Sequence, residues 1–164
     1  MTSIDQLNRE QLAQKFVDYL NATDEQREQQ VKKGHASERK AHGRVRVAKK
    51  HRDMWGTVNN RYHGGTGCVF VSCSGHGGVM TSPTIHHTID PELRHNNPYY
   101  YDDCGVYEED CASSIIAAYY PQRAEKMGFK YSDSNSTREG AAVAVAKWFE
   151  NELRNLLKRT SQEP

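Results

Sequence analysis

The chain has 164 residues, of which 36% are hydrophobic and 26% charged, and its formal net charge is only +1. The length is typical of one domain, and a mean hydropathy of -0.89 indicates a modest core. The sequence has no run of about eighteen apolar residues and no signal-peptide pattern at its start, so we expect a cytoplasmic protein without membrane spans.

The first fifty residues are expected to be helical. Residues 4–20 repeat apolar side chains at helical spacing, and Ser3 with Gln6 forms a capping-box pattern before them. Thr23 with Gln26 resembles a second helix start. The stretch that follows, to about residue 52, is polar nearly all round and predicts a weak helix that is ordered mainly by contacts.

Positive charge is concentrated between residues 32 and 52, where nine Lys and Arg face one acid, Glu38. Such a basic arm would contact phosphates or an acidic partner without reading bases. It contains no interleaved aromatic residues, so stacking on single-stranded bases is not indicated. The candidate contact residues are Lys40, Arg44, Arg46, Lys49, Lys50 and Arg52. Two other readings stay open: a solvated face, or pairing with the seven acids between residues 90 and 110.

Strand patterns begin at Trp55. Residues 55–59 and 66–73 predict two strands joined through Gly64-Gly65, and 79–81 predicts a third after a turn at Gly77-Gly78. Residues 84–104 have little periodicity and predict a long surface loop that ends near three tyrosines, 99–101.

The remaining chain predicts mainly helices. A helix over 107–119 would end at Pro121, and a short strand is expected over 129–131. Ser136 with Glu139 predicts the start of the last helix, whose expected buried stripe comprises Val145, Trp148, Phe149, Leu153, Leu156 and Leu157. The predicted fold is α+β: a short antiparallel sheet packed by helices, with a helical N-terminal part (1–53) and an α+β domain (54–164).

Two short motifs are the candidates for chemistry. In the first, Ser74-Gly75-His76-Gly77-Gly78, glycines flank an imidazole. Glycines serve tight turns, but they also clear space so that a substrate or partner can approach His76. The turn is in addition a plausible anion-binding nest, although it lacks the lysine of a P-loop.

The second motif, Tyr107-Glu108-Glu109-Asp110-Cys111, places three carboxylates in a row. In the first turn of a helix, acids gain roughly 0.3–1 kcal/mol each from the macrodipole, which explains one of them. A carboxylate beside a histidine can also act as a base, orient the imidazole or bind a hard metal ion. The candidate catalytic residues are therefore His76, Glu108, Glu109 and Asp110.

The four cysteines, Cys68, Cys73, Cys104 and Cys111, match no standard zinc spacing, and buried thiols are the commoner outcome. Cys68 and Cys73 should face opposite sides of one strand. Cys73 with His76 is also a candidate nucleophile pair. A divalent metal stays open, with further candidate ligands in the predicted loop (His86, His87, His95, Asp90, Asp102 and Asp103) and in the hairpin turn (His63).

Over about residues 55–120 the chain resembles a family of uncharacterised domains from phages and plasmids. The resemblance rests on Trp55, the Ser-Gly-His-Gly-Gly turn, Ser82-Pro83 and the Tyr-Glu-Glu-Asp-Cys segment, with Val106 where the family pattern has tryptophan. It implies an accessory protein of a mobile element, and such proteins often act against host defence.

Two functions follow as expectations. The first is a phage-type accessory factor that binds a host protein or nucleic-acid complex through its basic arm and its acidic, tyrosine-rich loop. The second is a small hydrolase or metal-dependent enzyme that uses His76 with Glu108, Glu109 or Asp110. Whether the chain is an enzyme, and whether it forms oligomers, is left open.

Overall fold

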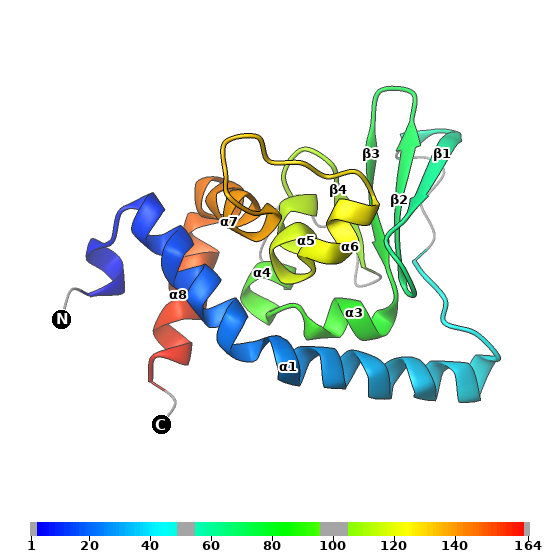
Figure 1. Ribbon diagram of the computed structural model, residues 1–164, viewed down its shortest axis with the longest axis horizontal. Coiled ribbons are helices and arrows are strands. Elements are labelled where there is room, and N and C mark those ends of the chain that lie inside the picture. The colour runs from blue at the N-terminus through cyan, green and yellow to red at the C-terminus, as the bar shows by residue number, and fades with distance from the viewer. Residues whose placement is uncertain (1–2, 49–54, 96–104, 163–164) are drawn as a thin grey trace.

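The computed structural model describes residues 3–48, 55–95 and 105–162. It confirms the α+β class: a four-stranded antiparallel sheet stands at one end of the molecule, and helices fill the rest (Figure 1). The long first helix runs beneath the other helices toward the sheet (Figure 1).

The sheet contains β1 (Val58–His63), β2 (Cys68–Cys73), β3 (Gly77–Thr81) and β4 (Val106–Glu108), in the order β1-β2-β3-β4. Every neighbouring pair is antiparallel. The β1–β2 hairpin was expected, but Trp55 lies before β1 rather than in it. The glycines Gly77 and Gly78, predicted as a turn, belong to β3 itself.

The two faces of the sheet have different surroundings. On one face Cys68, Val79 and Tyr107 belong to the main core, which the helices complete. On the opposite face Val69, Val71 and Met80 belong to a second, smaller cluster with Trp55. Alternation along the strands thus gives the sheet two apolar faces, of which the first packs against helices and the second against Trp55.

The N-terminal region is a short 3₁₀ turn, η1 (Ile4–Gln6), followed by one long helix, α1 (Arg9–His42). The Ser3–Gln6 capping box is present, but it caps η1, and Asn8 caps α1. The predicted second start at Thr23 is wrong, because the Thr23 hydroxyl donates to the Tyr19 carbonyl, 2.9 Å away, within a continuous helix.

Contacts with the body hold the polar second half of α1. His35 lies 2.9 Å from the Ser82 hydroxyl, and Glu38 accepts a hydrogen bond from the Thr84 amide. Gly34 faces Thr84 so closely that a Cβ would lie 2.4 Å from its methyl group. The helix then ends at Gly43 in the left-handed region.

Two short helices occupy the first part of the predicted loop over 84–104. These are α3 (Pro83–Thr88), capped by Ser82, and α4 (Pro91–His95). Proline at the first position of each helix is favourable, because that amide would have no helical partner. The rest of the predicted loop, 96–104, lies outside the described residues.

The predicted helix over 107–119 is wrong in its first half. Residues up to Glu108 form β4, a turn follows, and α5 covers only Ser113–Tyr119. Pro121 begins α6 (Pro121–Lys126) directly after it. The acidic run is therefore the end of a strand and the start of the turn after it, and the macrodipole argument for its carboxylates does not apply.

The C-terminal helix pattern divides into α7 (Thr137–Trp148) and α8 (Glu150–Thr160). Ser136 caps α7 as expected. The predicted stripe is buried except for Trp148, which is 46% exposed. The strand expected over 129–131 is absent, since those described residues have no regular structure.

The main core joins α1 to the rest of the chain. Leu12, Phe16 and Leu20 of α1 lie in the same cluster as residues of the sheet and of α5, α7 and α8. The division into 1–53 and 54–164 stays a prediction. Within the described residues, every helix is too short or too polar to cross a membrane.

Candidate functional site

Pairing of β3 with β4 brings the two sequence motifs side by side. The Glu109 amide donates to the Gly77 carbonyl over 3.1 Å, one residue beyond the β4 ladder. The His76 carbonyl in turn accepts from the Cys73 amide over 2.7 Å, which closes the turn between β2 and β3. His76 and Glu109 are thus neighbours on adjacent strand ends, as the hypothesis of a shared site requires.

Glu108 and Glu109 point to opposite faces of the sheet, because successive strand residues alternate. Glu108 lies opposite Gly78, whose missing side chain would meet the Trp55 ring. Its carboxylate is buried on that face and accepts the Cys111 amide over 3.3 Å. Burial, with Asp110 nearby, raises the pKa of Glu108.

The Glu109 carboxylate lies over Gly77 on the helical face of the sheet, close to the Phe70 ring. Partial burial raises the pKa of Glu109, the charge of Asp110 adds to the rise, and His76 opposes it. Among the described groups, no hydrogen bond or ion pair joins His76 to Glu108, Glu109 or Asp110. The motifs meet, but the structure shows no bonded dyad.

The glycines of the first motif have identifiable structural reasons. Gly75 has φ +95°, a conformation that the turn requires. A Cβ on Gly77 would lie 2.6 Å from the Glu109 Oε2, and one on Gly78 would lie 2.3 Å from the Trp55 ring. The space above both strand glycines is therefore filled by side chains of this chain, while His76 itself is exposed.

Cys68, Cys73 and Cys111 are all buried. Cys68 belongs to the main core, with burial raising its pKa to about 12, and Cys73 belongs to the opposite cluster. The predicted opposite orientation is confirmed. The described residues contain no group of three His, Cys, Asp or Glu side chains placed to hold a metal ion; Cys104, Asp102 and Asp103 lie outside them.

A second candidate site is a cationic groove on the face of the sheet that bears Trp55. It comprises two adjoining cavities, each of about 590 Å³, that share Arg44, Arg61 and Val69. The cationic side chains that line it are Arg39, Arg44, Arg46, Arg61 and, when protonated, His63. Among the described residues of both linings there is no Asp or Glu. We call these two cavities together the arginine groove.

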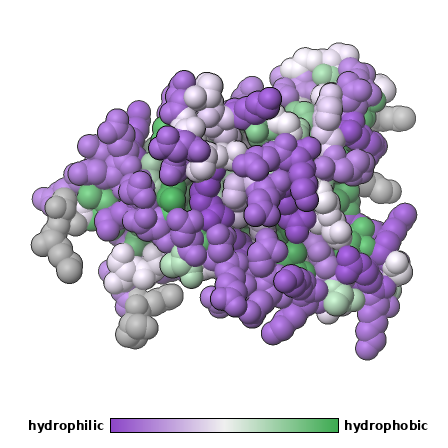
Figure 2. Space-filling model, viewed as in Figure 1, coloured by the Kyte–Doolittle hydropathy of each residue, from purple (hydrophilic) through white to green (hydrophobic). Residues whose placement is uncertain are grey.

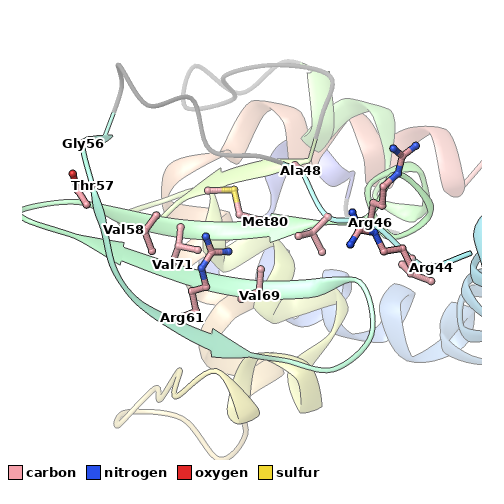
Figure 3. A pocket seen from close by; sticks show the side chains of 12 residues that line it. Arg44, Arg46, Ala48, Gly56, Thr57, Val58, Arg61, Val69, Val71 and Met80 are labelled. Atoms are coloured by element: carbon pink, nitrogen blue, oxygen red, sulfur yellow. The ribbon is translucent and has the colours of Figure 1, made fainter. Parts of the chain in front are cut away.

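The arginine groove has an apolar floor between cationic walls. Val69, Val71 and Met80 of β2 and β3 form the floor, while Arg61 rises from β1 and Arg44 and Arg46 lie at the opposite end (Figure 3). The wall segment is fixed to the sheet by a hydrogen bond from the Ala48 amide to the Thr81 carbonyl, 2.9 Å. Arg44, Arg46 and Arg61 are exposed and make no ion pair with any described carboxylate.

The basic residues expected from the sequence divide into three groups. Arg44 and Arg46 line the groove, whereas Lys40 is exposed on α1 outside its described lining. Lys49, Lys50 and Arg52 lie outside the described residues. Sequence reasoning missed Arg61, and it named His63 only as a candidate metal ligand. Both join the arm through the β1–β2 register, and their alternation on an exposed strand, Val58–His63, was the available signal.

The rest of the described surface has fewer features that indicate a binding site. The face seen in Figure 2 is largely hydrophilic, with apolar residues in small separate areas. The large hydrophobic side chains exposed among the described residues are Tyr62, Val143 and Trp148. A third cavity, of about 710 Å³, lies between α1 and α6, and its charged lining mixes acids such as Glu28 with bases such as Arg123.

Comparison with known proteins assigns the chain to a family. The model of the family described as "Domain of unknown function (DUF7007)" matches residues 48–163, which include the sheet and the helices from α3 to α8. The chain belongs to this family. No curated protein and no solved structure matches the chain.

Proposed function

We propose that this member of the DUF7007 family is a binding protein that engages an anionic surface of a partner macromolecule through the arginine groove. The observation that carries the proposal is the groove's described lining: four arginines and no carboxylate. Exposed guanidinium groups without internal acids favour carboxylate or phosphate partners, because each can donate two parallel hydrogen bonds.

The low net charge of the chain makes the clustering of arginines in the groove informative. With a formal charge of +1, the protein has no general attraction for polyanions. Any such binding must come from a local field, and the groove gathers arginines from α1, from residues 44–46 and from β1. The partner class is accordingly a host protein or nucleic-acid complex with an acidic surface.

The setting we propose is that of a phage or plasmid accessory protein acting in the cytoplasm of its bacterial host, in opposition to host defence. The support for it is the sequence resemblance at Trp55, the Ser74–Gly78 turn and the Tyr107–Cys111 segment. A small protein whose groove binds acidic surfaces suits that role, since occupying a partner's surface requires no chemistry.

The test measures binding to labelled polyglutamate and to labelled single-stranded DNA, at about 50 mM and about 200 mM salt. We expect the R44E/R61E variant to bind at least one probe about tenfold more weakly than the unchanged protein. The matched control is K15E/K130E, which reverses two exposed cations outside the groove. Equal losses in both variants would refute a role for the groove.

An enzymatic function is a second candidate, favoured by the adjacency of His76 and Glu109. A carboxylate with a raised pKa beside an exposed imidazole is suited to exchange protons with a bound substrate. The expected result is loss of a hydrolytic activity in His76→Ala and Glu109→Gln, with unchanged folding and groove binding. An activity that survives both changes would exclude this site.

A further inference from the structure

We infer that the cavity between α1 and α6 binds a small dipolar molecule, one that carries a carboxylate at one end and an ammonium group at the other. Free amino acids and short peptides have this chemistry. The cavity has a volume of about 710 Å³, and its described lining comes from α1, the β1–β2 turn, the α5–α6 junction and the start of α7. Its charged side chains all differ from those of the arginine groove, so the inference goes beyond the proposed function.

The two walls of this α1–α6 cavity carry opposite charges. Glu25 and Glu28 line it from α1, and both are exposed. The half-buried Arg123 and the exposed Lys126 line it from α6. Among the described residues, no ion pair joins these two acids to these two bases. An occupant can therefore contact both walls without breaking an existing ion pair.

Contacts within the chain hold the Arg123 guanidinium in place. Its Nη1 donates to the Thr66 carbonyl over 2.8 Å, and its Cζ lies 5.7 Å from the centroid of the Tyr120 ring. Stacking of this planar cation on an aromatic ring is favourable. The hydrogen bond to Thr66 uses one N–H group, so the guanidinium keeps others with which to bind a carboxylate. Because Arg123 is held in position before a ligand arrives, the entropic cost of binding is reduced.

The opposite wall is fixed close to Glu28. Asp24 lies four residues before Glu28 in α1, on the same face of the helix. Its Oδ1 accepts from Nη2 of Arg138 over 2.8 Å, and its Oδ2 accepts from Nη1 of the same guanidinium. Arg138 also donates through Nε to the Ala118 carbonyl over 3.0 Å. This pairing anchors α1 to the start of α7 and neutralises Asp24, so Glu25 and Glu28 supply the net negative charge of the wall.

The charges and the buried tyrosines select the class of ligand. A purely anionic molecule would place its charge against the two acids of α1, and a purely cationic molecule would place its charge against the two bases of α6; both arrangements are unfavourable. An apolar molecule would gain little, because Tyr119 and Tyr120 in the lining are only 2% and 3% exposed. A dipolar molecule satisfies both walls when its carboxylate accepts from Arg123 and its ammonium group donates to Glu28.

The test measures the affinity of the full chain for four probes by NMR titration of its amide signals. Triglycine carries both charges, N-acetyltriglycine lacks the ammonium group, triglycinamide lacks the carboxylate, and glycine carries both charges over a shorter span. We expect the tighter-binding zwitterion, triglycine or glycine, to bind about tenfold more tightly than either blocked peptide. Whether that zwitterion is triglycine or glycine identifies the ligand as a peptide or as an amino acid.

Variants at the two walls distinguish the two ends of the ligand. Glu28→Gln should weaken binding of triglycine and triglycinamide, which keep the ammonium group, and should leave N-acetyltriglycine unchanged. Arg123→Gln should weaken binding of triglycine and N-acetyltriglycine and leave triglycinamide unchanged. Lys126→Gln makes the same comparison as Arg123→Gln while keeping the hydrogen bond to Thr66.

The matched controls are Glu125→Gln and Lys130→Gln, which change exposed charges outside the described lining of the cavity and should leave all four affinities unchanged. Circular dichroism establishes that every variant remains folded. Equal binding of the zwitterions and the blocked peptides, or no shift of any cavity signal at about 10 mM probe, overturns the inference. Either result leaves the proposed function standing, because the R44E/R61E test concerns other side chains.

Discussion

The three glycines of the Ser74–Gly78 motif have different structural roles, although the sequence alone does not distinguish them. Gly75 supplies a positive φ, whereas Gly77 and Gly78 have room for no side chain because Glu109 and Trp55 occupy it. The presence of a turn and the opposite orientation of Cys68 and Cys73 could be predicted from local pattern alone. The neighbours of each glycine could not, because they come from segments about twenty to thirty residues away.

Gly78→Ala tests this difference. A Cβ there would lie 2.3 Å from the Trp55 ring and 2.5 Å from the Tyr107 carbonyl, so we expect the free energy of unfolding to fall by about 2 kcal/mol or more. Gly75→Ala is the control, with open space around it and only the cost of positive φ, about 1 kcal/mol. Denaturant titration measures both. A smaller loss in Gly78→Ala than in Gly75→Ala would contradict the packing assigned to Trp55.

Glu108 gives a prediction for stability against pH. Because burial raises its pKa in the folded protein, the folded state binds the proton more tightly than the unfolded state. Its contribution is therefore present at pH below the ordinary value of 4.5 and is lost as pH rises through the folded pKa.

We expect Glu108→Gln, whose amide oxygen can still accept the Cys111 amide, to be more stable than the unchanged protein at pH 7. Thermal unfolding at about pH 4 and about pH 7 should show the advantage shrinking at the lower pH. An equal effect at both values would show that the charge of Glu108 is not the cause.

At the scale of elements, periodicity predicted the helices with continuous apolar stripes and failed where tertiary pairing decides. The acidic run satisfies the pattern of a helix start, yet pairing with β3 draws Val106–Glu108 into the sheet. Likewise α1 continues through the apparent start at Thr23, because His35 and Glu38 make contacts with the segment at Ser82 and Thr84 that compensate for its polar sequence.

The junction of α7 and α8 provides a test with neighbouring aromatic residues. Phe149 is fully buried in the main core, while Trp148 is 46% exposed. We expect Phe149→Ala to lower the free energy of unfolding by about 3–5 kcal/mol and Trp148→Ala by less than about 1 kcal/mol. Comparable losses in denaturant titrations of the two variants would mean that the junction is rotated from the arrangement described.

His35, in the second half of α1, makes the free energy of unfolding depend on pH. Burial lowers its pKa below the ordinary 6.5; Arg123 and Arg39 act in the same direction, while Glu38 and Glu28 oppose it. The unfolded chain therefore binds a proton at a higher pH than the folded protein does, and the free energy of unfolding falls as pH decreases through about 6.5.

We expect this fall to be weaker in His35→Gln, which cannot titrate. The measurement is denaturant unfolding at about pH 7.5 and about pH 5.5 for both proteins, with His42→Gln, an exposed histidine at the end of α1, as control. A fall that is unchanged in His35→Gln would assign the pH dependence to other groups.

At the scale of the whole molecule, folding separates the basic residues that form one arm in the sequence, so that some line the groove and others lie outside it. The α+β class and the arm itself could be predicted, because they follow from composition and local pattern. The groove could not: Arg39, Arg44 and Arg46 meet Arg61 only because residues 44–48 cross the face of the sheet that bears Trp55. That arrangement turns a charged stretch into a site with a floor, two walls and no internal acid among its described residues.

The most direct test of the central claim is to observe the arginine side chains themselves. In NMR spectra of the Arg Nε–Hε groups, assigned by Arg→Lys substitution, addition of polyglutamate should shift the signals of Arg44, Arg46 and Arg61. The signal of Arg154, which donates to Glu150 and to the η1 backbone far from the groove, should stay in place. Binding that leaves the three groove signals unmoved would contradict the account.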